Sequence, residues 1–499
     1  MKAIVNMYYN IGVSILPQIV NIVSSFILPV LIINIYGSQI NGLTATIKSL
    51  VGYISLVGAG IATVTTQSLY GPIARQDAPT VRGMLRAAAN MFNRCGYIYI
   101  VIVLVVSFVY PFFIKENISY TTTVLLLVVM SISGASEFFV VGRCRSLLYA
   151  DRKVYVATGI QSLSLIVSLI LAVIMLKFET NIVLVQLGIS SVYIARALLL
   201  ALYVRKRYPQ YECRKDTKPI MNAVKKRKDA MIHQLSGLIV FGSQSIILSV
   251  MVSLEAASIY AVYNIIFSGL YSICSNINVA ISPFLGKTLA VGTIEKVKKE
   301  FNMMEYLFYI LTTVVLTVTI LTILSFISLY TKNADINYIY PRYALMFVII
   351  QVFNMYRLPN IAIINVAGHF KETRSRAIIE SIICLVASII FTFFGGMYGV
   401  LVGTGIAIGW RCFDMIWYTY KYILAGSFLT SLFRLARALS IIVLFYFVVK
   451  NPFLLIDSYF DWMLYVMVIL LIVSIVLAID ALLFERKSLN DIMKVVLRK

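Results

Sequence analysis

Lys48 is the residue whose position most needs a chemical explanation. It lies in the apolar stretch TATIKSLVGYISL (44–56), and the nearest charged residue along the chain is Arg75. A lysine near the centre of a lipid-facing helix costs about 2.5–3.5 kcal/mol unless its side chain reaches the membrane surface. In a low-dielectric cavity the same ammonium group is a natural counter-charge for pyrophosphate or an acidic sugar. The sequence leaves both interpretations open, and the second predicts an anion-binding residue.

Polar residues at helical spacing accompany Lys48 and predict the lining of a cavity. Thr44 and Ser55 share its segment, and Gln18 and Asn21 lie on one face of the preceding segment. Two later segments repeat the pattern and supply the remaining predicted substrate-binding residues: Gln244, Tyr260, Asn264, Tyr271 and Asn278. Single residues of these types also join helices to one another in lipid. Four polar faces together favour a water-filled cavity.

The sequence contains no convincing catalytic or metal-binding motif. LGKT (285–288) ends like a phosphate-binding loop, but Ile281 stands where that loop requires a glycine. The six cysteines show no CxxC spacing, and His233 and His369 are isolated in the sequence. We therefore expect no enzyme activity, no metal site and no cofactor.

The elements that position these residues are membrane spans. Apolar residues make up 60% of the 499 positions, compared with about 45–50% in soluble domains. Runs of about 20 apolar residues cross ~30 Å of hydrocarbon. Such runs are predicted at 11–34, 42–68, 96–114, 121–141, 156–176, 182–203, 233–253, 257–282, 306–330, 341–364, 377–394, 400–420, 431–449 and 459–484. The predicted fold class is an all-α integral membrane protein with about 14 transmembrane helices.

The basic residues predict the orientation of these spans. Most of the 43 Lys and Arg residues lie on the side that carries both termini; besides Lys48, the exceptions are Lys115, Lys177, Lys332, Arg342 and Lys450. The positive-inside rule places that side in the cytoplasm. The net charge of +22 is then mainly a topology signal. We expect the basic segment 205–228 to contact anionic membrane lipids and not nucleic acid.

An internal repeat divides the chain. Arg196 recurs as Arg411, and QSLSLIVSLI from Gln161 resembles ESIICLVASI from Glu380. Parallel six-span repeats are typical of transporters that bind their substrate between two lobes. The predicted divisions are an N-terminal six-helix lobe (1–206), a basic linker (207–231), a C-terminal six-helix lobe (232–422) and two extra helices with a tail (423–499). Arg196 and Arg411 are expected to be structural, with carboxylate or lipid phosphate partners.

Four stretches resemble bacterial polysaccharide flippases of the Wzx type, within the multidrug/oligosaccharidyl-lipid/polysaccharide exporter superfamily. They are GLTATIKSLVGYISLVGAGIATVTTQSLYGPIARQD (42–77), FFVVGRCRSLLYADRKVYV (138–156), SIYAVYNIIFSGLYSICSNINVAISPFLGKTLA (258–290) and YRLPNIAIINVAGHFKETR (356–374). The resemblance implies two lobes around a cationic cavity lined by spans 1, 2, 7 and 8. It implies a cargo of oligosaccharide on undecaprenyl pyrophosphate, moved by alternating access to the outer leaflet of the bacterial inner membrane. It also implies polysaccharide polymerase machinery as a partner.

The source of energy is open at this stage. The resemblance implies an acidic residue in many relatives where this chain has the neutral Gln244, so coupling to Na⁺ or H⁺ is undecided. The carboxylates at membrane level are expected near the cytoplasmic ends, where they can reach water or pair with Arg143, Arg376 or Arg411: Glu137, Glu380, Asp414 and Asp480. A multidrug antiporter of the same fold is the main alternative, and the expected lack of deep carboxylates argues against it. The short external loops argue against a polymerase, and the polar faces argue against a lipid scaffold.

Overall fold

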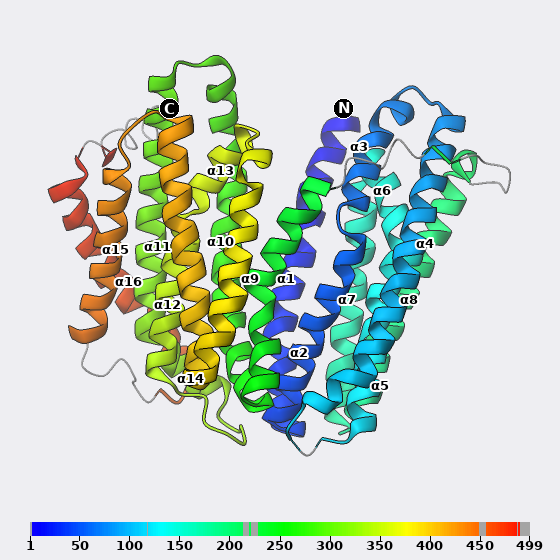
Figure 1. The fold of residues 1–499 in the computed structure, drawn as a ribbon, viewed down its shortest axis with the longest axis horizontal. Helices are drawn as coiled ribbons and strands as arrows, with labels where there is room; N and C mark the ends of the chain where they lie inside the picture. The colour runs from blue at the N-terminus through cyan, green and yellow to red at the C-terminus, as the bar shows by residue number, and fades with distance from the viewer. Residues whose placement is uncertain are drawn as a thin grey trace. The chain divides into compact units, whose positions relative to one another are not determined.

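The computed structural model describes residues 2–116, 118–212, 219–220, 228–448, 456–486 and 488–489 (Figure 1). These residues form helices joined by turns and short loops, with no strand among them. The predicted all-α fold class is therefore confirmed. Much of the predicted basic linker 207–231, including Cys213, lies outside the described residues.

The chain forms two compact units, Met1–Ala261 and Val262–Lys499. The division falls inside α10 (Leu254–Val291), whose first residues contact α2 of the first unit, as α9 does: Asn41 Nδ2 donates to Ser258 Oγ at 2.7 Å. The division into lobes 1–206 and 232–422 remains a prediction.

The first unit contains the helices up to the start of α10. In chain order they are α1 (Lys2–Tyr36), α2 (Ser38–Ile54), η1 (Ser55–Gly58), α3 (Ile61–Ala74), α4 (Ala78–Val109), η2 (Tyr110–Phe113), α5 (Tyr120–Ser136), the π-helix η3 (Glu137–Val141), α6 (Gly142–Ala150), α7 (Val154–Lys177), α8 (Ile182–Arg207), η4 (Pro209–Tyr211) and α9 (Lys228–Met251).

The second unit contains the remainder of α10 and the later helices. They are α11 (Ile294–Tyr330), α12 (Pro341–Tyr356), α13 (Leu358–Val366), α14 (Phe370–Tyr418), the π-helix η6 (Thr419–Ile423), α15 (Leu429–Val448) and α16 (Tyr459–Phe484).

The helices account for all fourteen predicted spans. Among the described residues, twelve helices are long and apolar enough to cross a membrane. One of them, Phe370–Ile423, bends at Gly396 (φ 53°, ψ −133°) and contains two predicted spans. The shorter apolar helix Leu235–Met251 accounts for another. The positive φ at Gly396 is a conformation that favours glycine, which explains the residue type at the bend.

The second predicted span differs from the expectation of one continuous run at 42–68. After α2 the chain forms the short 3₁₀-helix η1, and α3 begins only at Ile61. Gly60 separates them with φ 77°, a left-handed conformation that glycine adopts without strain. The interruption leaves backbone groups at membrane depth, which proteins tolerate where they line a cavity or are buried in protein.

Local sequence also explains where the long helices begin. Asp77 precedes α4, and its carboxylate accepts a hydrogen bond from the Thr80 backbone N–H at 3.1 Å. Hydrogen bonds from Thr80 lower the pKa of the Asp77 carboxyl. Asn181 caps α8 in the same way, accepting from the Val183 N–H at 2.9 Å. These side chains satisfy backbone donors that the first helical turn leaves without partners.

Candidate functional site

The ten predicted binding residues are divided between the two units. Gln18, Asn21, Thr44, Lys48, Ser55, Gln244 and Tyr260 belong to the first unit, and Asn264, Tyr271 and Asn278 belong to the second. The cavity expected to unite them remains a prediction. Within the second unit the three lie along α10, and Asn278 is buried.

The first unit does bring the predicted second and seventh spans together. Thr46 Oγ1 on α2 donates to the Ser245 carbonyl on α9 at 3.2 Å, and the Tyr53 hydroxyl donates to the Leu238 carbonyl at 3.0 Å. A Cβ at Gly42 would lie 1.8 Å from the Leu254 carbonyl oxygen, so only glycine allows this approach of α2 to the start of α10. The polar residues of α2 thus serve helix packing as well as any cavity.

The predicted residues of α2 and α9 have different surroundings. Thr44 is buried and donates to the Asn41 carbonyl at 3.0 Å. Gln244 is also buried, and its Nε2 donates to the Val240 carbonyl at 2.5 Å. Lys48 is exposed, and no described carboxylate forms an ion pair with it. Among the predicted binding residues, Lys48 alone carries a charge.

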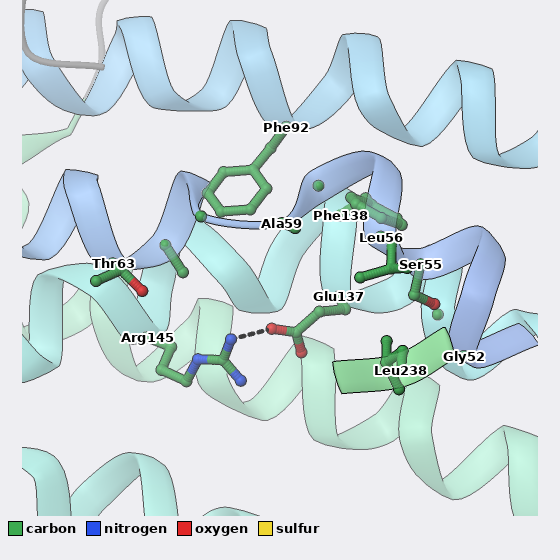
Figure 2. A pocket seen from close by; sticks show the side chains of 14 residues that line it. Gly52, Ser55, Leu56, Ala59, Thr63, Phe92, Glu137, Phe138, Arg145 and Leu238 are labelled. Atoms are coloured by element: carbon green, nitrogen blue, oxygen red, sulfur yellow. Dashed lines mark ion pairs between the residues drawn. The ribbon is translucent and has the colours of Figure 1, made fainter. Parts of the chain in front are cut away.

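A cavity of about 410 Å³ lies within the first unit, at the interruption of the second span. Gly52, Ser55 and the segment Gly58–Gly60 form one side of it. The walls are completed by Leu56, Ala62, Thr63, Phe92, Gly134, Glu137, Phe138, Arg145 and Leu238 (Figure 2). Its volume lies in the range of about 300–1,000 Å³ that is usual for small-molecule sites.

Glu137 and Arg145 point toward each other in this cavity (Figure 2). Arg145 Nη2 lies 2.6 Å from Glu137 Oε1. In a regular α-helix two residues eight apart would lie about 80° apart around the axis. The wider turn of the π-helix η3 brings them closer to one face, and π-turns of this kind are frequent at functional sites. Glu137 therefore pairs with Arg145 and not with Arg143, one of the arginines that the sequence offered as a partner.

A second guanidinium contributes to the same site. Arg196 Nη2, on α8, lies 4.0 Å from Glu137 Oε2. The side chains of Arg145 and Glu137 are 31% and 32% exposed, and that of Arg196 is 13% exposed. One carboxylate and two guanidinium groups give the site one net positive charge. Such a site can attract an anion through its arginines, or a cation or proton through its carboxylate.

The second unit contains a buried ionic cluster around Glu380. Arg357 Nη1 donates to Glu380 Oε1 at 2.6 Å, and Arg411 Nε lies 3.4 Å from Glu380 Oε2. Arg411 Nη1 also donates to Asp414 Oδ2 at 2.6 Å, and Arg376 pairs with Asp414. The predicted carboxylate partners of Arg411 and Arg376 are confirmed.

A second buried cluster joins the C-terminal helices to α11. Arg434 of α15 donates to Glu305 Oε2 at 3.1 Å and to Glu485 Oε2 at 2.8 Å. Arg437 lies 3.4 Å from Asp480, which pairs with it and not with the arginines named in the sequence analysis. Burial raises the pKa of the Glu485 carboxyl, but hydrogen bonds and the charge of Arg434 outweigh burial and leave it below its usual value. This cluster fixes α15 and α16 to the second unit.

Sequence reasoning missed several of these residues. Arg145, Arg357 and Arg434 were not proposed, and Glu305 was lost because span 9 was predicted to begin one residue later. Gly58 and Gly60, two residues apart inside an apolar run, were an available signal for the interruption that opens the cavity. Within the described residues, no group of three or more His, Cys, Asp or Glu side chains could hold a metal ion.

Solved structures with this fold are membrane transporters. An inward-facing multidrug resistance MATE family transporter of the MOP superfamily aligns with a TM-score of 0.62 at 12% identity, covering 87% of this chain and 99% of that chain. The lipid II flippase MurJ, in an inward closed conformation, aligns with a TM-score of 0.62 at 15% identity, covering 96% of this chain and 100% of that chain. The Vibrio cholerae MATE transporter VcmN, as a mutant, aligns with a TM-score of 0.54 at 12% identity, covering 84% and 99%.

No family model and no curated protein matches the sequence. At these identities the structural likeness establishes the fold. The chain is a multi-pass membrane protein with the fold shared by MATE transporters and MurJ.

Proposed function

We propose that the protein is a flippase that moves oligosaccharide units linked to undecaprenyl pyrophosphate from the cytoplasmic to the outer leaflet of a bacterial inner membrane, for surface polysaccharide synthesis. It is a transporter and not an enzyme in this proposal. Both termini lie in the cytoplasm, as the distribution of Lys and Arg predicts. The polymerase machinery outside receives its product.

The observation that carries this proposal is the extent of the likeness to MurJ. That flippase aligns over 96% of this chain, whereas the MATE transporter with the same TM-score aligns over 87%. The part of this chain that the MATE transporter leaves uncovered is comparable in length with section 423–499, which contains α15 and α16. The buried cluster around Arg434 makes these two helices an integral part of the second unit.

The chemistry of the first unit supports an anionic cargo. Lys48 is an exposed cation on α2, and Arg145 lines the cavity where the same span is interrupted. Both groups suit the pyrophosphate or an acidic sugar of the cargo. In this mechanism, alternating access carries the charged head group through the protein while the prenyl tail stays in lipid.

Multidrug transport is a second candidate function, favoured by Glu137. Its carboxylate lines the cavity, where it could take up a proton or a cationic drug. The MATE transporters provide the same fold at an equal TM-score. A strain without this protein separates the two functions: loss of surface polysaccharide supports the flippase, whereas drug sensitivity with normal polysaccharide supports the multidrug transporter.

The substitution Lys48→Ala tests the proposed role of α2. We expect normal insertion and abundance but a block in polymer export, because the predicted central cavity loses an accessible cation. Lys48→Arg should retain part of the export because it keeps the charge in an altered geometry. Lys332→Ala, which removes an exposed lysine from a loop, is the control. Normal surface polysaccharide in Lys48→Ala cells at matched protein levels would show that Lys48 is only a membrane-surface anchor.

A further inference from the structure

The cavity of the first unit is lined by an ion pair, Glu137 and Arg145, and is large enough for a small ligand. Arg145 and Glu137 each leave about a third of the side chain exposed, at 31% and 32%. In the buried clusters of the second unit, Arg434 is 1% exposed and Arg411 is 3% exposed. The first pair is therefore open to exchange with a ligand in a way that the buried pairs are not.

We propose that this cavity is an oxyanion subsite in which Arg145 binds the ligand and Glu137 acts as a tethered competitor. Without ligand, the Glu137 carboxylate occupies Arg145; an incoming phosphate or carboxylate group displaces it. The inference rests on the proposed function, which supplies such groups as the diphosphate of the carrier or an acidic sugar. It assigns to them a subsite separate from Lys48, which does not line the cavity.

The geometry of the pair suits exchange. Glu137 Oε1 lies 2.6 Å from Arg145 Nη2, yet the two groups are not aligned as a hydrogen bond. A partly exposed ion pair contributes little to stability in typical proteins, so its partners can be exchanged at little cost. A diphosphate carries more charge than one carboxylate and can accept two parallel hydrogen bonds from a guanidinium group.

Arg196 provides a place for the displaced carboxylate. Its Nη2 lies 4.0 Å from Glu137 Oε2, at the outer limit of an ion pair. A small rotation of the Glu137 side chain away from Arg145 would tighten this second contact. The carboxylate then stays paired while Arg145 binds the ligand, so the exchange requires no proton transfer.

The remaining walls allow an anion to approach. Gly58 faces the Phe138 ring, and a Cβ there would lie 2.2 Å from its Cε1 atom, so a side chain would disturb this wall. Ala62 and Thr63, in the first turn of the 14-residue helix α3, also line the cavity. Backbone N–H groups of a first helical turn lack partners within the helix and favour negative charge. They add to the attraction that Arg145 provides.

Binding of inorganic pyrophosphate to the purified full-length protein in lipid nanodiscs tests the proposal. The wild type should bind, and Arg145→Gln should bind at least about tenfold more weakly, as expected for loss of a charge-assisted hydrogen bond. Glu137→Gln should bind about tenfold more tightly because the competitor is removed. Arg145→Lys, which keeps the charge, should bind with intermediate affinity. Arg205→Gln, at an exposed pair with Glu212 (3.5 Å), is the matched control.

The opposite signs of the two substitutions distinguish exchange from a structural role. A structural ion pair predicts that both substitutions weaken binding, and that result would overturn the proposal. A parallel titration with glucuronate identifies the source of the oxyanion, and a lack of binding by both probes also overturns the proposal.

Polymer export is measured separately. If export depends on the protein but not on Arg145, the subsite is wrong while the proposed function stands. If export does not depend on the protein, the proposed function fails, and the binding data still decide whether the subsite exists.

Discussion

The two units treat charged side chains within their membrane spans in different ways. In the first unit, Glu137 contacts Arg145 and Arg196 at the edge of a cavity, with about a third of the carboxylate side chain exposed. In the second unit, Glu380 is 9% exposed and is held between Arg357 and Arg411. An exposed pair can exchange partners at little cost, whereas a buried charge that loses its partner is strongly destabilising. The comparison indicates a binding role for the first cluster and a structural role for the second.

The predicted internal repeat offers a reason for this difference. Arg196 and Arg411 occupy matching positions, but Gln161 stands where the second copy has Glu380. The Glu380 carboxylate, which pairs with the buried Arg411, therefore has no counterpart at the matching position of the first copy. The first copy uses Glu137 on the π-helix η3, which faces the cavity. The first unit thus carries an open cluster and the second unit a sealed one.

Glu380→Ala should give the largest effect on folding. It leaves Arg357 buried and removes one partner of Arg411, and breaking a buried pair in this way costs about 3–5 kcal/mol. We expect a large loss of folded protein, measured by size-exclusion chromatography of a fluorescent fusion and by thermal unfolding. Glu372→Ala, at an exposed carboxylate on the same helix, should stay close to wild type. A normal yield of Glu380→Ala would show that the second cluster is not structural.

Thiol labelling should separate the two clusters by accessibility. Thr63→Cys, in the wall of the cavity, should react with a small membrane-permeant reagent, and bound pyrophosphate should slow the reaction. Native Cys384 and Cys412 are buried in the helix that carries Glu380, and they should stay unmodified while the protein is folded. A Cys213→Ser background removes the cysteine outside the described residues. Equal labelling of Cys412 and of Thr63→Cys would remove the distinction between an open and a sealed cluster.

The helices and the clusters differ in how far the sequence predicts them. Hydropathy predicts spans because each span must be apolar over the whole membrane thickness, and the fourteen runs correspond to observed helices. The partner of Glu137 depends on an extra residue in one helical turn, which apolar runs do not reveal. The partners of Glu305, Arg434 and Ser431, are more than a hundred residues away in the sequence, so no local pattern indicates them. Burial of such pairs is set by tertiary packing and not by local composition.

Arg411→Gln and Arg196→Gln should have unequal effects on stability. Arg411 contacts both Glu380 and Asp414 and is 3% exposed, whereas Arg196 reaches one carboxylate at 4.0 Å. We expect a loss of about 3 kcal/mol or more for Arg411→Gln and of less than about 1 kcal/mol for Arg196→Gln. Chemical unfolding in detergent with both variants side by side gives the comparison. Equal losses would mean that the first cluster is as structural as the second.

Glu137→Ala should give the smallest effect on stability and is the sharpest test of the comparison. The variant leaves Arg145 and Arg196 without their carboxylate, but Arg145 can be hydrated from the cavity, so the expected loss is below about 1 kcal/mol. Pyrophosphate should then raise the unfolding temperature of Glu137→Ala more than that of the wild type, because the anion neutralises the two arginines without competition. Thermal unfolding with and without pyrophosphate measures both effects, and Glu137→Gln controls for the lost side-chain volume. A loss of stability as large as that of Glu380→Ala, with no recovery in pyrophosphate, would show that Glu137 is a structural residue. It would also argue against an oxyanion subsite in the cavity.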